Sequence, residues 1–155
     1  YKIGIIGIST VETVFSTVTN ISELQYDDYI KIINSESEQL RKKGANAVIV
    51  IAHVGLNCKN DPNKIRLEYK LRDKNTIQGK CSKNEEAAIL LEKLKPGTID
   101  LFLAGHKHDT VHNWVNGIPA MSTDRNGRYA QIVYLPFDKK TKKLYFFSSH
   151  DFHIT

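Results

Sequence analysis

The segment Ala47-Val48-Ile49-Val50-Ile51-Ala52 decides the fold, because it is apolar at every position and leads directly into His53-Val54-Gly55. Strands that are apolar on consecutive positions are typical of parallel sheets buried on both faces. A second largely apolar segment, residues 99–104, leads into Gly105-His106-Lys107-His108. In open α/β sheets, ligands bind beyond the carboxyl ends of the strands. The two segments therefore predict strands whose ends gather histidines at one edge of a sheet.

Helices are predicted between the strands. Residues 27–43 carry an apolar stripe with helical spacing, and Gly44 is placed to end that helix in the left-handed conformation. Residues 84–94 predict a second, shorter helix that is capped by Asn84. Together with a strand at residues 2–8, this alternation of strand and helix predicts an α/β fold with parallel pairing.

The last third of the chain has the pattern of an antiparallel sheet. Asn116-Gly117 separates two short strand-like runs, residues 110–115 and 118–121, and such a dipeptide is a strong signal for a two-residue hairpin. Residues 128–137 and 143–147 predict two further strands.

Size and charge restrict the class of protein. A chain of 155 residues with 41% hydrophobic residues suits one domain with a real core. The net charge of +5 is spread over segments that also contain Asp, Asn or Thr, so we expect no nucleic-acid partner. No apolar run approaches the ~20 residues of a membrane-spanning helix, so no transmembrane segment is expected in this chain. Because Tyr1 leads straight into a predicted strand, we expect that something upstream is missing or removed.

Cys58 and Cys81 bracket a polar, charged insertion. A disulfide between them is the favoured interpretation, and two free thiols or a second metal site are the alternatives. Disulfides persist in oxidising compartments, so an oxidised pair predicts a secreted, cell-surface or lumenal protein.

The histidines are the candidate metal ligands. His106 and His108 are two residues apart in a predicted loop, so their side chains can reach one ion or two adjacent ions, and His53 ends the neighbouring strand. We expect a structural role for His112 and a solvated tail around His150 and His153. Motifs for a phosphate-binding loop, a dinucleotide fold and a serine nucleophile are absent from the sequence.

The chain resembles the calcineurin-like metallophosphoesterases and, among them, the 5′-nucleotidase branch. The resemblance is carried by residues 2–8, 44–55 and 99–108, by Asn116-Gly117-Ile118-Pro119 and by Gly127-Arg128-Tyr129. The resemblance extends over nearly the whole chain except the insertion at residues 58–81. It implies an α/β fold that is part of a four-layer α/β/β/α sandwich with mixed sheets, in which residues 110–147 form the second sheet.

The resemblance also implies a site with two divalent metal ions, of which His53 and His106 bind one and His108 the other. Zinc, manganese, iron, magnesium and calcium are not distinguished. The family's remaining ligand motifs, Asp-x-His, Gly-Asp-x-x-Asp and Gly-Asn-His-Asp or Glu, do not occur in this sequence. We therefore interpret residues 1–155 as a single partial domain, its C-terminal portion, whose partner is the missing N-terminal half. No catalytic residue is predicted within the chain, and its substrate-binding residues are unknown.

The predicted function of the complete protein is metal-dependent hydrolysis of phosphomonoesters such as nucleotides, in which a metal-activated water attacks phosphorus. This chain alone is expected to be inactive. One alternative is a non-catalytic structural or interaction module that retains the fold. A weaker one is a mononuclear zinc site formed by His53, His106 and His108, since three histidines plus water is a known catalytic zinc arrangement.

Overall fold

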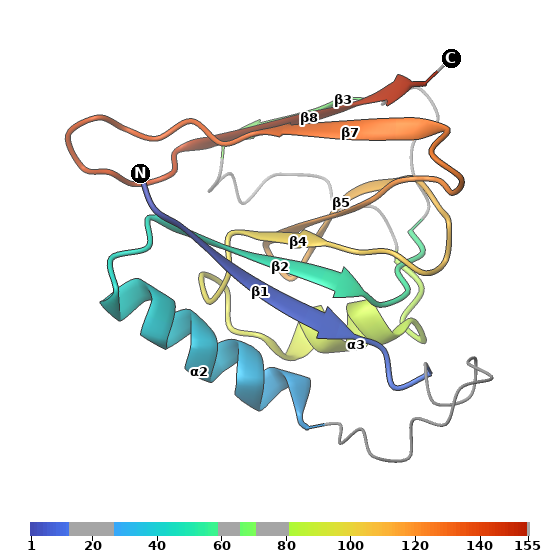
Figure 1. The fold of residues 1–155 in the computed structure, drawn as a ribbon, viewed down its shortest axis with the longest axis horizontal. Coiled ribbons are helices and arrows are strands. Elements are labelled where there is room, and N and C mark those ends of the chain that lie inside the picture. The colour runs from blue at the N-terminus through green and yellow to red at the C-terminus, as the bar shows by residue number, and fades with distance from the viewer. Residues whose placement is uncertain (13–26, 59–65, 71–80, 155) are drawn as a thin grey trace.

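Two sheets and two helices make up the part of the chain that the computed structural model describes, namely residues 1–12, 27–58, 66–70 and 81–154. In chain order the elements are β1 (Ile3–Ser9), α2 (Tyr29–Lys42), β2 (Ala47–His53), β3 (Arg66–Lys70), α3 (Glu86–Lys93), β4 (Leu101–Leu103), β5 (Val111–Val115), β6 (Ile118–Ser122), β7 (Tyr129–Tyr134) and β8 (Phe146–His153). Both helices lie on one face of a five-stranded sheet, and a three-stranded sheet lies over the other (Figure 1). Neither helix is long and apolar enough to cross a membrane.

The five-stranded sheet has the order β1-β2-β4-β6-β5. Its first four strands are parallel, and β5 is antiparallel to β6. The three-stranded sheet, β3-β8-β7, is antiparallel throughout. The expected α/β fold with mixed sheets is therefore confirmed, and the described residues supply three layers of the four-layer sandwich, helices, mixed sheet and antiparallel sheet.

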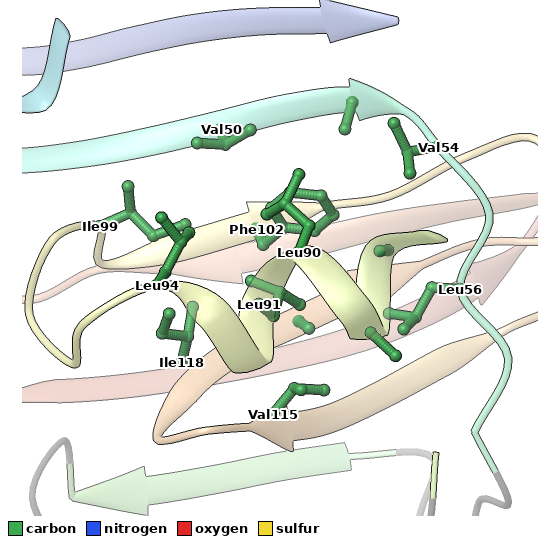
Figure 2. Packing of buried hydrophobic residues seen from close by; sticks show 14 of the residues in the cluster. Val50, Val54, Leu56, Leu90, Leu91, Leu94, Ile99, Phe102, Val115 and Ile118 are labelled. Carbon is green, nitrogen blue, oxygen red and sulfur yellow. The ribbon is translucent and has the colours of Figure 1, made fainter. Parts of the chain in front are cut away.

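The core explains why the central strands are apolar at consecutive positions. Phe102 of β4 faces the helices and packs with Val50, Leu90 and Leu91 in the larger buried cluster, which Figure 2 shows around α3. Its neighbour Leu101 faces the second sheet and packs with Trp114, Met121 and Val133. Full burial of each such side chain contributes roughly 1.5–3 kcal/mol to folding, so both faces of the sheet stabilise the fold.

The ends of the helices follow from local chemistry. Asp28 caps α2, since its carboxylate accepts hydrogen bonds from the backbone N–H groups of Ile30 and Lys31 at 2.8 and 3.3 Å. Gly44 follows the helix with φ of +88°, as predicted. The predicted cap of α3 is wrong, because Glu85 rather than Asn84 occupies the cap position and its side chain makes no capping hydrogen bond.

The Asn116-Gly117 hairpin is confirmed, with φ of +50° and +71° at its two central residues. The side-chain amide of Asn116 also donates hydrogen bonds to the carbonyl oxygens of Leu91, Glu92 and Leu94 at 3.2, 3.3 and 2.7 Å. The turn therefore joins the β5–β6 hairpin to the carboxyl end of α3.

Three expectations for the last third are corrected. The hairpin at residues 111–122 belongs to the five-stranded sheet, because all five residues of β6 are buried and the strand pairs with β4. The second sheet instead consists of β7, β8 and β3, the last of which lies within the insertion. His150 and His153 belong to β8 and not to a solvated tail. A single alternation pattern does not reveal which sheet a hairpin joins.

Cys58 and Cys81 form the favoured disulfide, and no free cysteine is present. The bond connects the segment after β2 to the segment before α3, and their backbones also pair as an antiparallel bridge. Cys58 is buried in the larger core cluster.

Loss of the disulfide should lower the free energy of unfolding. The bond closes a loop with a sequence separation of 23 residues, for which the chain-entropy estimate gives roughly 3 kcal/mol. Urea unfolding of the oxidised protein and of Cys58→Ser/Cys81→Ser measures the difference. A reducing agent should lower the midpoint of the parent and leave that of the double variant unchanged. Equal midpoints for the oxidised parent and the double variant would contradict the expectation.

Candidate functional site

The candidate site lies where the parallel strands end together. In register, Ser9 of β1 pairs with His53 of β2, and Leu103 of β4 pairs with Met121 of β6. The backbone N–H of Gly105 donates a hydrogen bond to the carbonyl oxygen of Val54 at 3.3 Å. This contact draws the loop after β4 toward the end of β2, as the sequence predicts for parallel neighbours.

His53 and His106 meet at this edge. Nε2 of His53 lies 3.1 Å from Nδ1 of His106, and the rings are in edge contact with centroids 4.9 Å apart and an interplanar angle of 74°. The side chain of His106 is 24% exposed, and His53 is exposed. In the absence of an ion, a contact of this length needs one donor and one acceptor, so one of the two nitrogens would carry a proton.

Glu12 contacts the other nitrogen of His106 and was missed by the sequence analysis. Its Oε2 lies 2.9 Å from Nε2 of His106. The backbone N–H of Glu12 donates to the buried hydroxyl of Thr10 at 3.1 Å, and that hydroxyl donates to Oε2 of Glu86 at 2.5 Å. A usable signal was present, since Glu12 stands just beyond the carboxyl end of the first predicted strand.

The loop that carries the predicted ligands has a strained backbone. His106 and His108 have φ of +77° and +59°, in the left-handed region that residues other than glycine rarely adopt. Each such residue costs on the order of 1 kcal/mol, and such residues cluster at functional sites. Besides the bond from Gly105, two further backbone hydrogen bonds hold the loop, from Ala104 N–H to Met121 O at 2.6 Å and from Lys107 N–H to Gly105 O at 3.0 Å.

Lys107 anchors the same loop to α3. Its Nζ lies 3.8 Å from Oε2 of Glu85. The side chain crosses directly over Gly55, where an added Cβ would lie only 2.8 Å from Cγ of Lys107. A side chain at this position would force the lysine stem to shift, so glycine leaves room for it. An open hollow of about 310 Å³ borders Glu12, His106 and Lys107.

The pair of histidines fits a metal ion. Nitrogens that are each about 2.0–2.1 Å from one ion and 3.1 Å from each other subtend about 100° at that ion, which suits tetrahedral or octahedral coordination. A carboxylate on the second nitrogen of a ligating histidine, as Glu12 provides, is the usual support for such a ligand.

The three predicted ligands are not all brought together. His108 is exposed, and none of its hydrogen bonds or ring contacts within the described residues joins it to His53 or His106. Across residues 1–12, 27–58, 66–70 and 81–154, no three His, Cys, Asp or Glu side chains are grouped closely enough to hold an ion. His112 lies elsewhere, on β5, where its Nε2 is 3.1 Å from Nε2 of Gln131 on β7.

Comparison with known proteins gives two curated relatives, and no family model matches the chain. The cell wall protein Lmo0130 of Listeria monocytogenes is 31% identical over 145 residues, which cover 90% of this chain and 17% of the relative. Endonuclease YhcR of Bacillus subtilis is 27% identical over 124 residues, which cover 80% of this chain and 8% of the relative. The chain thus spans less than a fifth of either relative's length.

Three solved structures share the architecture, each at 18% sequence identity. A protein assigned as a 5′-nucleotidase of Staphylococcus aureus has a TM-score of 0.68, with 98% of this chain and 27% of that chain covered. Sulfate thiohydrolase SoxB of Thermus thermophilus has 0.63, with 97% and 22% covered. Calcineurin-like phosphoesterase YfkN of Bacillus subtilis has 0.64, with 97% and 43% covered. The sequence resemblance is thereby confirmed at the level of the fold.

Substitution of Gly55 by alanine should displace Lys107 and disturb the histidine loop. We expect a loss of stability of about 1–3 kcal/mol, as for other overpacked sites, and NMR shift changes at His106 and His108. Lys107→Ala should remove the obstacle, so that Gly55→Ala costs less in that background. Gly7→Ala is the control, because a Cβ at Gly7 meets no atom within 4 Å. Equal costs of Gly55→Ala with and without Lys107 would contradict the packing argument.

Proposed function

We propose that this chain, which has the fold of the calcineurin-like phosphoesterases, supplies part of a two-metal site to a phosphate ester hydrolase. The single observation that carries the proposal is the approach of His53 Nε2 to within 3.1 Å of His106 Nδ1 at the carboxyl ends of parallel strands. In this proposal the two histidines hold one ion, and His108 contributes to the second. The remaining ligands come from outside this chain.

The ions, when bound, polarise the phosphate and lower the pKa of a water that attacks phosphorus. The role proposed for the residues of this chain is to bind the ions and hold them in position. His53 and His106 present nitrogens from two different strand ends, and His108 follows on the same strained loop. No general acid or base is assigned to the chain.

The substrate class is a phosphate ester, and a phosphomonoester such as a nucleotide is our first candidate. A phosphodiester is the second candidate, because one curated relative is named an endonuclease. Two features favour a location outside the cytoplasm, namely the disulfide and a relative named a cell wall protein.

We further propose that the rest of the domain packs beside β1. Among the described strands β1 lies at an edge of its sheet, where unpaired backbone groups can accept another strand. Ile3, Ile5 and Ile51 are 41%, 61% and 48% exposed and lie on the face that the second sheet leaves open. Residues two apart on a strand share a face, so His53 lies on the same face as Ile51. Whatever covers these isoleucines therefore reaches the candidate site, and it is well placed to bring the missing ligands.

A non-catalytic module with the same fold is the alternative function. It shares the packing surface on β1 but requires no ion at the histidine pair, so metal binding and turnover separate the two.

Metal binding and activity test the main proposal. Zinc or manganese titrated into this chain should bind with one ion per chain at the pair, and His53→Ala or His106→Ala should weaken binding at least about 100-fold, since each removes a direct ligand. His153→Ala is the control.

In protein that includes the rest of the domain, a chelator and His106→Ala should each abolish hydrolysis of p-nitrophenyl phosphate. Hydrolysis of bis(p-nitrophenyl) phosphate instead of the monoester would favour the second substrate class. Metal-independent turnover, or no turnover at all, would overturn the hydrolase proposal.

A charge on the open face tests the packing surface. In this chain alone, Ile5→Lys should lower self-association and the binding of a hydrophobic dye. In protein that includes the rest of the domain it should cost about 1–3 kcal/mol, the penalty for a charge in an apolar contact. Ile89→Lys is the matched control, because Ile89 is 43% exposed on α3 at the opposite face. Equal effects of the two substitutions would contradict a specific surface on β1.

A further inference from the structure

We propose that Glu12 is a positioning residue that fixes the protonation of the His106 ring, so that Nδ1 is presented as a free ligand nitrogen toward His53. The inference rests on the proposed function, because it assigns a role at the same histidine pair. It adds a residue that no ligand motif identifies and that acts through His106.

The first step of the argument is the contact between Glu12 and His106. An ionised carboxylate can only accept hydrogen bonds. Since Oε2 of Glu12 lies 2.9 Å from Nε2 of His106, the ring must carry its proton on Nε2. The other tautomer would place two acceptors in contact, which costs free energy.

The second step is the consequence at the other nitrogen. A neutral imidazole has one N–H, so Nδ1 of His106 carries a lone pair. At 3.1 Å it accepts the Nε2 proton of His53. An ion held by these two nitrogens would take the place of this proton. His53 would then release the proton of Nε2 to water and take one up on Nδ1, so that its charge would not change. For His106 no rearrangement is needed, because Glu12 has already placed the proton on the far nitrogen.

The third step is the way in which Glu12 itself is held. Its side chain is 57% exposed and would otherwise sample several rotamers. Thr10 fixes the backbone from which this side chain extends, because its hydroxyl accepts the backbone N–H of Glu12 and donates to Glu86 of α3. The backbone N–H of Thr10 also donates to the carbonyl oxygen of His53 at 2.9 Å. One residue thus ties Glu12 to the strand end that carries the partner histidine.

The experiment compares the parent chain with Glu12→Ala, Glu12→Gln and Glu92→Ala. Imidazole ¹⁵N NMR of the neutral rings in the metal-free chain should show His106 protonated on Nε2, with slow exchange of that proton. Glu12→Ala should lose the slow exchange, whereas Glu12→Gln should keep it, because the amide oxygen still accepts. Glu92→Ala removes an equal charge from an exposed position at a distance on α3 and should behave like the parent.

Zinc titration of the same four proteins is the second readout. Loss of a carboxylate behind a ligating histidine typically weakens metal affinity about 10–100-fold, so we expect that loss for Glu12→Ala and a smaller one for Glu12→Gln. An unchanged affinity for Glu12→Ala, or a parent His106 protonated on Nδ1, would overturn the inference. If no zinc binds even to protein that includes the rest of the domain, the proposed function fails, and the NMR signature of His106 still decides the role of Glu12.

Discussion

The parallel register of β1, β2, β4 and β6 is the constraint on which the site depends. Because these strands run in one direction, all of their carboxyl ends lie at one edge, and residues far apart in sequence meet there. The register persists because β2 and β4 are apolar at consecutive positions and each needs cover on both faces. Helices cover one face, and the antiparallel sheet covers part of the other. The uncovered part lies over β1 and β2, next to His53.

The local conformations at the site lower the stability of this framework. Two histidines adopt left-handed backbone, and the lysine between them lies across a glycine where an added side chain would displace it. Such costs persist only where the surrounding structure determines the conformation. Here the backbone bonds of Ala104 and Lys107 and the Lys107–Glu85 contact do so. Rigid presentation of the ligand nitrogens is what a metal site requires, since the ion tolerates small errors in distance only.

The sequence was sufficient for the features that local patterns determine. Strands β2 and β4, the left-handed Gly44 and the hairpin turn all follow from residue type and spacing, and so does the meeting of His53 with His106. The disulfide was the favoured one of three interpretations. The sequence was insufficient where partners are distant in the chain. The side of the sandwich that β6 joins depends on its pairing with β4, and β3 acquires its place only through β8. Glu12 is a similar case, because its contact with His106 spans 94 positions and a lone glutamate after a strand carries no distinctive pattern.

The turn at Asn116 has a consequence for the lifetime of the protein. An asparagine followed by glycine is prone to deamidation, because the small glycine leaves its backbone nitrogen free to attack the side-chain amide, and asparagine is accordingly among the thermolabile residues. In this structure the amide donates to three carbonyl oxygens at the end of α3. Deamidation would replace that donor with a carboxylate, which faces the same oxygens and the negative end of the helix dipole. Chemical ageing at one residue would therefore loosen the contact between the hairpin and the helix.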